Sequence, residues 1–225
     1  MKKKLSVMAL VAMLCSSVSL FSMDMSSLLP TKEHLSFSYQ HAFNSEHSDE
    51  SRADIMAGQF RMGASTFWND SHVGLGVNLC MGGPYTFSIK NKQDGSILKV
   101  PMDNIKGFNF GATIGCAVDI PINNMLNISI AIGPSYDYLT IVAPSMEIKD
   151  MLFGLGTILN VIISPNSLVN FVYGLDFNLY FLQLGYTEIN RNAYEAPAHT
   201  LFTEIKPYIG ISIKTSEIFR SATHR

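Results

Sequence analysis

The sequence predicts an all-β protein, an antiparallel up-and-down transmembrane β-barrel of about eight strands, and three observations support this prediction. Segments in which apolar and polar residues alternate recur along the chain. Short turns and long connections alternate between those segments, as they do in membrane barrels. Charged residues make up only 15% of the chain, whereas a typical soluble domain has roughly 25%.

The clearest segment is 169–181, VNFVYGLDFNLYF. Its odd positions are all large and apolar, and its even positions read Asn, Val, Gly, Asp, Asn and Tyr. Strict alternation at period two indicates a strand with two different faces. A strand of this length, apolar on one face and polar on the other, is typical of a transmembrane barrel.

Eight segments show this alternation. In chain order they are 34–43, 55–68, 73–81, 108–120, 126–138, 151–163, 169–181 and 200–213. Each is close to the ~9–11 residues that a tilted strand needs to cross a bilayer. The first five faces begin at Leu35, Phe60, Val73, Phe108 and Leu126, and the last three begin at Met151, Val169 and Leu201. An even number of strands also fits a closed antiparallel ring.

The connections differ in length. Segments 69–72, 121–124 and 164–167 are short and have turn composition, whereas 44–54, 82–107, 139–150 and 185–199 are longer. Short turns on the periplasmic side and longer outer loops would place both termini on the periplasmic side. Within 82–107, segments 85–90 and 97–100 flank Gln93-Asp94-Gly95, which predicts an additional hairpin.

Period two does not by itself say which face meets which solvent. A soluble barrel of the lipocalin type would turn its apolar face inward. Its outer face would then be the one rich in Gly, Ser, Asn, Ala and Thr, which is too poor in charge for a soluble surface. We therefore expect the apolar face to contact lipid. Phe67, Trp68, Tyr136 and Tyr138, near strand ends, are expected to form aromatic girdles.

The N-terminus has three lysines, an apolar run and then small residues, which predicts a secretory signal peptide over 1–22 followed by the barrel domain over 23–225. A buried helix and a lipoprotein acylated at Cys15 are the alternatives. Cys80 and Cys116 are expected on opposite faces of neighbouring strands, so no disulfide is predicted between them.

On this topology the chain resembles the small eight-stranded outer-membrane barrels of the OmpA, OmpX and OmpW group, over residues 35–213. The resemblance implies a bacterial outer-membrane location and, through the OmpW group, a narrow channel or lateral path for small hydrophobic molecules. One departure is clear. Such proteins usually end in an aromatic residue, whereas this chain continues past the last strand through 214–225, with Phe219 as its last aromatic.

Four charged residues fall on the predicted inner face. Arg61, Asp176, Glu204 and Lys206 are expected near mid-height. Charges in a dry lumen have to be paired or solvated. Two interpretations remain open: an ion-pair plug that seals the barrel, or a gate whose pairs rearrange. In both, Arg61→Ala would leave Asp176 or Glu204 unpaired.

No pattern in the chain predicts an enzyme, a cofactor or a metal site on a strand or helix, and the net charge of −2 argues against a nucleic-acid partner. The loops offer two candidate surfaces. Segment 44–54, with acidic residues beside histidines, could bind a divalent cation or a basic partner. The acidic residues are Glu46, Asp49, Glu50 and Asp54, and the histidines beside them are His41 and His47. Segment 82–107 is the preferred contact surface, with Lys90, Lys92, Lys99 and Lys106.

These observations favour a non-enzymatic, integral outer-membrane protein that acts through its exposed loops, in adhesion or in contact with a host or envelope ligand. Its other partner is the outer-membrane lipid. Two alternatives remain: transport of small hydrophobic molecules, and a soluble or lipid-anchored ligand-binding barrel.

Overall fold

The computed structural model describes residues 30–48, 51–68, 72–100, 102–144, 146–163, 169–189, 192–195 and 201–214. The predicted signal peptide, residues 1–22, lies outside them. No helix in these ranges has both the length and the apolar character needed to cross a membrane.

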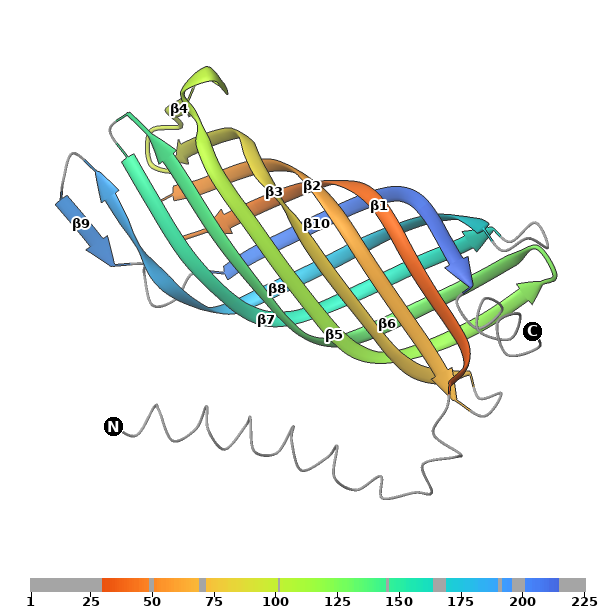
Figure 1. Ribbon diagram of the computed structural model, residues 1–225. Helices are drawn as coiled ribbons and strands as arrows, with labels where there is room; N and C mark the ends of the chain where they lie inside the picture. Colours follow the sequence, from red (N-terminus) through yellow and green to blue (C-terminus); the bar gives the residue numbers. More distant parts are fainter. Residues whose placement is uncertain are drawn as a thin grey trace, which may run out of the picture. The chain divides into compact units, whose positions relative to one another are not determined.

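Strands account for nearly all of the described chain (Figure 1). They are β1 (Pro30–His47), β2 (Ser51–Trp68), β3 (Val73–Asn91), β4 (Ile97–Val100), β5 (Lys106–Asn123), β6 (Leu126–Ala143), β7 (Met146–Ile163), β8 (Val169–Ile189), β9 (Asn192–Glu195) and β10 (Leu201–Lys214). The 3-10 turn η2 (Met102–Asn104) follows β4. β4 and β9 are short additions, so eight long strands remain among the described residues.

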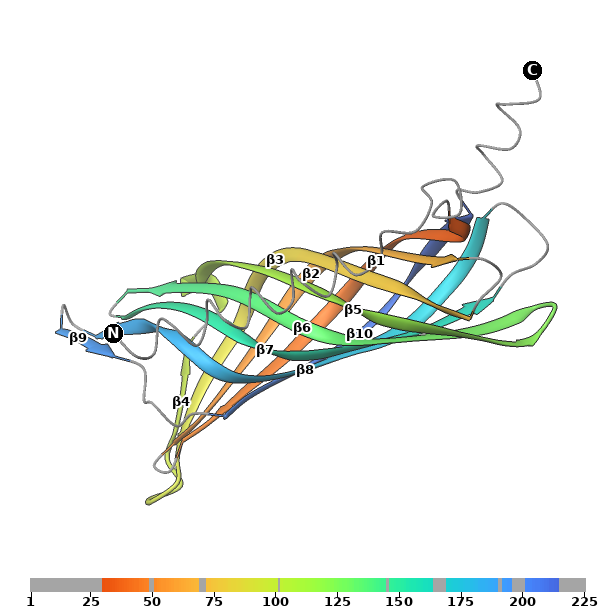
Figure 2. The same ribbon diagram turned by 90° about the horizontal axis from the view of Figure 1, so that it is seen from below.

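The eight long strands form a closed antiparallel ring in the order β10-β1-β2-β3-β5-β6-β7-β8, and β8 pairs with β10. At the seam between the two ends of the chain, Phe37 lies opposite Ile211 and Ser36 lies opposite Ser212. Figures 1 and 2 show β1 and β10 side by side across this seam. The ring leaves no free edge over its paired length, which is how a barrel satisfies its backbone in lipid. The predicted fold class is therefore confirmed.

The faces of the strands follow the sequence alternation. On β8, Phe171 and Phe177 are exposed on the outer wall, whereas Asn170, Asp176 and Asn178 are buried inside. Large apolar side chains are exposed on all eight long strands. Because water would oppose so much exposed apolar surface, this outer face is the lipid-contacting face of a transmembrane barrel.

Cys80 is buried inside the barrel and Cys116 is exposed outside, and both are free thiols. The predicted absence of a disulfide between them is confirmed. The additional hairpin is also confirmed, because β3 and β4 pair from Phe87 opposite Val100 to Lys90 opposite Ile97. β4 and β9 lie at the same end of the barrel, which we name the loop end (Figure 1). The opposite end, which carries the β2–β3, β5–β6 and β7–β8 connections, is the turn end.

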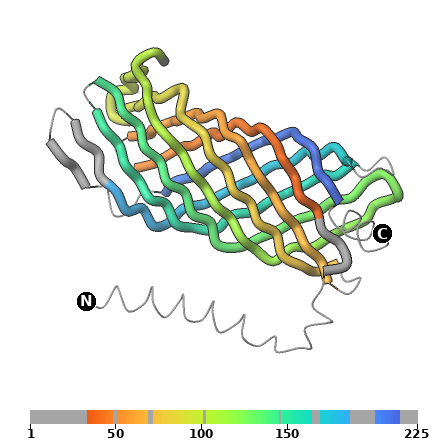
Figure 3. The backbone as a smooth tube through the Cα atoms, in the orientation of Figure 1, coloured from red at the N-terminus to blue at the C-terminus, as the bar shows by residue number. Residues whose placement is uncertain are grey.

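For three of the segments predicted as long connections, the prediction of a loop is wrong. Segment 44–54 is mostly strand, with β1 running to His47 and β2 starting at Ser51. Segment 139–150 contains a tight turn between Ala143 and Met146, and segment 185–199 contains the β8–β9 hairpin. The continuous tilted trace of each strand is visible in Figure 3. Strands of 18 to 21 residues are about twice as long as a bilayer requires.

The physical reason is that pairing continues past the lipid while the polarity of the inner face changes. At the loop end the inward residues are apolar, and they pack into one cluster. Its buried members are Ile55, Phe87, Leu139, Ile141, Met146, Ile148, Leu152, Tyr180 and Phe202. A rule that identifies strands by an apolar outer face and a polar inner face misses this region.

The predicted position of Phe67 is also wrong. This residue was expected in an aromatic girdle, but it is fully buried inside the barrel against Ala117, Ala131 and Ile158. Strict alternation on β2 puts Phe60 and Met62 outside and therefore turns every odd residue inward. On β6, Tyr136 lies on the outer side, where its ring contacts Phe153 at 5.0 Å between centroids.

The closing seam predicts a specific cross-link. In Ser36→Cys with Ser212→Cys, two directly opposed residues are expected to form a disulfide, because their Cα atoms lie within the distance that a bridge tolerates. Non-reducing electrophoresis of the heat-denatured protein should then show a faster, compact band. Ser36→Cys with Ser88→Cys is the control, since β3 is no neighbour of β1 and Ser88 lies at the loop end of β3. Equal cross-linking in the control pair would contradict the register.

Candidate functional site: the polar lumen

The structure places all four sequence-predicted site residues inside the barrel. Arg61 comes from β2, Asp176 from β8, and Glu204 and Lys206 from β10, and none is more than 3% exposed. They do not form a single cluster in which all four charged groups pair with one another. They divide between two layers of the lumen, which we name the lower tier and the upper tier, the lower being nearer the turn end.

The lower tier is centred on Arg61 and Asp176. The Arg61 guanidinium donates from Nε to Asp176 Oδ2 at 3.0 Å and from Nη1 to Ser36 Oγ at 3.3 Å. Asn78 also donates to Asp176. The guanidinium lies over the Tyr208 ring, 3.8 Å from its centroid. Arg61 is therefore fixed by side chains from β1, β8 and β10, and its charge is matched by one carboxylate.

The upper tier is centred on Lys206, which lies between two carboxylates. Lys206 Nζ is 2.6 Å from Glu204 Oε2 and 3.7 Å from Asp137 Oδ2, and it also donates to Cys80 Sγ at 3.6 Å. Asn178 Nδ2 and the Tyr180 hydroxyl each donate to Glu204 Oε2 at 2.8 Å. One ammonium group thus neutralises part of two carboxylates, and neutral donors supply the other hydrogen bonds.

The upper tier continues around the wall through amides. Gln40 donates to Gln59, Gln59 donates to Asn109, and Asn109 Nδ2 donates to Asp137 Oδ1 at 2.6 Å. These bonds connect β1, β2, β5 and β6. Together with Tyr180 and Lys206, they join most of the ring into one hydrogen-bonded layer, which is what a dry lumen requires of its polar groups.

Sequence reasoning missed Asp137 and Tyr180 as members of this network. Both stand on the inner face of their strands, so alternation alone assigned the correct side. What alternation does not give is height, because the stagger between strands decides which inward residues meet. The expected partner of Arg61 was Asp176 or Glu204, and the structure selects Asp176.

Gly111 provides the space for Lys206. A Cβ atom at this position would lie 2.7 Å from Cys80 Sγ and 2.8 Å from Asp137 Oδ2. The lumen is so full at this height that a single methyl group would collide with the network. The inward glycine is therefore required by packing and not by its backbone angles.

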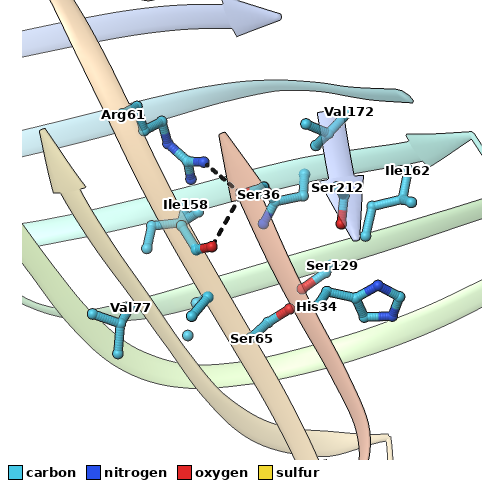
Figure 4. Close-up of a pocket in the computed structure, with 15 residues that line it drawn as sticks. His34, Ser36, Arg61, Ser65, Val77, Ser129, Ile158, Ile162, Val172 and Ser212 are labelled. Atoms are coloured by element: carbon cyan, nitrogen blue, oxygen red, sulfur yellow. Dashed lines mark hydrogen bonds between the residues drawn. The ribbon is translucent and has the colours of Figure 1, made fainter. Parts of the chain in front are cut away.

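Below the lower tier, small side chains surround a cavity of about 10 Å³, room for about one water molecule (Figure 4). Ser36 links Arg61 to this region and donates to the Gly63 carbonyl at 3.2 Å. Among the described residues, Ser129 Oγ, Ser212 Oγ and both side-chain polar atoms of Asn170 have no protein partner. The turn-end half of the lumen is thus narrow, and polar atoms lie there beside apolar side chains.

The acidic segment 44–54 does not form a cation site in the described part of the chain. There, no group of three or more His, Cys, Asp or Glu side chains is arranged to hold a metal ion. Ser45 donates to Asp54 at 2.8 Å, and Arg52 pairs with the same carboxylate at 2.9 Å. Asp49 and Glu50 lie outside the described residues.

Glu46 and Asp150 form an acidic pair on the inner side of the wall at the loop end, beyond the ~10 residues that cross the membrane. Burial raises the pKa of Glu46 to about 7; the nearby charge of Asp150 adds to the shift and a hydrogen bond with Gln183 opposes it. Burial also raises the pKa of Asp150 to about 6, again opposed by Gln183.

No family model matches the chain, and no curated protein matches it in sequence. Solved barrels of bacterial outer-membrane proteins are similar to it in structure. Neisserial surface protein A has a TM-score of 0.48 at 11% identity, with 80% of this chain and 96% of that chain covered. Ail, the attachment invasion locus protein of Yersinia pestis, has 0.44 at 11%, covering 81% and 100%. A major outer membrane protein of Thermus thermophilus has 0.46 at 12%, covering 80% and 98%.

The lower tier predicts a large cost for removing its cation. Arg61→Ala leaves Asp176 buried without its ion-pair partner, which is expected to cost about 3–5 kcal/mol of the free energy of unfolding. Urea unfolding in lipid vesicles, followed by heat-dependent gel mobility, measures this value. Arg61→Met with Asp176→Asn should lose less than Arg61→Ala, since no charge remains unpaired. Arg52→Ala, on a half-exposed pair, should cost about 1 kcal/mol or less. An Arg61→Ala protein as stable as wild type contradicts the pairing.

The acidic pair predicts a pH-dependent loop end. Because the pKa values of Glu46 and Asp150 are raised on folding, the folded wall binds more protons than the unfolded chain. Their contribution to stability is complete below the ordinary values of 4.5 and 3.8. It is lost as pH rises through about 6 and about 7.

Amide exchange at the loop end of β7 and β8, corrected for intrinsic rates, should therefore show weaker protection at pH 8 than at pH 4. Glu46→Gln should flatten this profile, and Glu147→Gln, whose partly exposed carboxylate pairs with Lys149, should not. A profile unchanged by Glu46→Gln contradicts the assignment.

Proposed function

We propose that this chain is a non-enzymatic, integral protein of the bacterial outer membrane that acts through the surface projecting from its loop end. The observation that carries the proposal is the filled lumen. An eight-stranded ring encloses little more than its own inward side chains. Here those side chains form two hydrogen-bonded polar tiers, with apolar clusters toward both ends.

A permanently open path through this barrel is disfavoured by its energetics. The route past the upper tier crosses Lys206, Glu204 and Asp137, all at most 2% exposed. A solute would then have to displace the apolar cluster at the loop end. Separating buried ion pairs exposes charges that no other group neutralises, which costs several kcal/mol. Transport of small hydrophobic molecules is therefore the second hypothesis.

The projecting surface supports contact with another molecule. Beyond the lipid band, β2, β3 and β4 continue as one paired sheet in which Arg52 lies opposite Lys90, and Lys90 lies opposite Ile97. Lys99 lies opposite Ser88, on the same face. Lys90 and Lys99 are exposed, and so is Ile97 at 57%. A rigid scaffold that displays basic and apolar side chains together is suited to recognition.

We place the loop end on the outer side of the membrane because membrane barrels have short turns facing the periplasm and long hairpins facing outward. On this topology the β3–β4 hairpin is displayed on the cell surface. Its basic face favours an acidic partner over a basic one, and complementary charge would accelerate encounter.

The decisive experiment combines conductance with adhesion. In planar bilayers, the wild-type protein is expected to give no channel events, because the tiers remain closed. Cells that produce it should adhere to an immobilised extracellular-matrix preparation more than cells that lack it. Arg52→Glu with Lys90→Glu and Lys99→Glu should remove most of that gain.

Lys214→Glu, at the turn end of β10, is the matched control and should adhere like wild type. Stepwise conductance of the wild-type protein, together with adhesion unchanged by the triple substitution, would support transport instead. Membrane fractionation and heat-dependent gel mobility establish that each variant is folded.

A further inference from the structure

We propose that the outer wall over β1, β2, β3 and β5 binds one phosphorylated membrane lipid. Its acyl chain lies in an apolar groove, and its phosphate lies at His41, Tyr85 and Lys106. This lipid site is separate from the projecting surface of the proposed function and does not depend on it.

The groove lies on the lipid-facing wall. Its volume is about 540 Å³, and its lining comes from β10, β1, β2, β3 and β5. The lining is predominantly apolar and includes Phe37, Phe60, Met62, Leu79, Met81 and Phe110. Phe60 and Met81, two of its walls, are 72% and 53% exposed. An apolar hollow of this size within the lipid band is suited to a hydrocarbon chain.

Toward the loop end, the groove is closed by the Tyr39 ring, which lies in the space left by a glycine. Gly58 lies opposite Gly83 on the neighbouring strand. The Tyr39 hydroxyl occupies the place of a side chain at Gly58, because it is 2.5 Å from where a Cβ would stand. A larger residue at Gly58 would therefore displace the Tyr39 ring. Tyr39 consequently leans over β2 and forms the upper wall of the groove.

Aromatic rings lead from the groove toward the loop end with increasing polarity. The Phe60 and Tyr39 rings are 6.0 Å apart, Tyr39 and His41 are 5.1 Å apart, and His41 and Tyr85 are 6.0 Å apart, all edge-to-face. His41 Nδ1 and the Tyr85 hydroxyl are within hydrogen-bond distance at 3.2 Å. The row thus begins at a hydrocarbon ring and ends in groups that can donate to a phosphate.

The height of this polar end matches the membrane surface. From Trp68, at the turn end of β2, to Gly58 the strand climbs roughly 25 Å at a tilt of about 40°. That is about the thickness of the apolar band of a membrane barrel. Rings with a polar edge favour this interface, and lipid phosphates lie at the same level.

Lys106 supplies the positive charge at that level. On β5, Asn109 lies opposite Gly82, and Pro84 packs 2.7 Å from where a Gly107 Cβ would stand. The β3–β5 pairing ends there, and Tyr85 lies in a bulge of β3. The contact between Pro84 and Gly107 still brings the backbone of Lys106, next to Gly107, near that of Tyr85, next to Pro84. Lys106 is exposed, and it shares the outward face with Phe108 because the two are separated by one residue.

The combination identifies the occupant. Phosphate oxygens only accept hydrogen bonds, and an ammonium, a phenol and an imidazole N–H can all donate to them. A second copy of the barrel would fill the groove but has no need of a cation at its rim. The charge at Lys106 therefore favours a phosphorylated lipid.

Native mass spectrometry of the detergent-purified protein tests the site, with phosphatidylglycerol and the phosphate-free lipid diacylglycerol supplied in equal amounts. The wild-type barrel is expected to retain one phosphatidylglycerol molecule and to prefer it about tenfold. The free energy that corresponds to a tenfold preference is smaller than the contribution of two charge-assisted hydrogen bonds. Lys106→Gln with Tyr85→Phe should abolish the preference. Met81→Trp should fill the groove and reduce retention of both lipids. Lys214→Gln and Leu155→Trp, placed elsewhere on the chain, are the controls and should behave like wild type.

Three results would overturn the proposal: equal retention of the two lipids by wild type, retention unchanged by both site variants, or release of the lipid by excess inorganic phosphate. A mass corresponding to two barrels without lipid would assign the groove to a second copy. Heat-dependent gel mobility verifies that every variant is folded.

Discussion

The structure depends on one constraint: any charge that points into a closed ring of eight strands has to be met by other inward side chains, through an opposite charge or through hydrogen bonds. The lumen is too narrow for a bulk-water shell, and an unpaired buried charge is very costly. Lys206 shows the consequence most directly, because it lies between Glu204 and Asp137 while Gly111 leaves it the space to do so. The register around the ring and the choice of small residues both serve this pairing.

Alternation predicted the sides of the strands because a pleated strand has no freedom about which side a residue takes. Phe171, Asp176 and Ile211 all lie on the expected side. Height was not predictable, because it depends on the stagger between strands, which no single segment encodes. For this reason Asp137 was missed and Arg61 was left with two possible partners.

The ends of the strands were mispredicted for a different reason. Leu139, Ile141 and Ile148 point inward although they are apolar, so the rule of apolar outside and polar inside fails past the lipid. Phe67, at the turn end, is likewise an apolar residue that points inward. Where the outer solvent changes from lipid to water, the apolar face becomes the inner one. The strand continues, but its polarity pattern reverses.

In the proposed function, the filled lumen leaves the outside of the barrel as the functional surface. The inner wall fixes the shape of the ring, and the outer wall presents an apolar hollow, an interfacial row of rings and a basic projecting sheet. The rigid inner wall keeps the geometry of these outer surfaces reproducible. The two faces of the same strands thus have different chemistry, polar and hydrogen-bonded inside and apolar outside.

The most direct test of the pairing constraint is a double-mutant cycle on Lys206 and Glu204, measured by urea unfolding in lipid vesicles. With Lys206→Met and Glu204→Gln alone and combined, a coupling energy of about 2 kcal/mol or more is predicted, because the two groups lie in one buried network. A coupling energy within about 0.5 kcal/mol of zero would contradict the claim that paired charges hold the lumen closed.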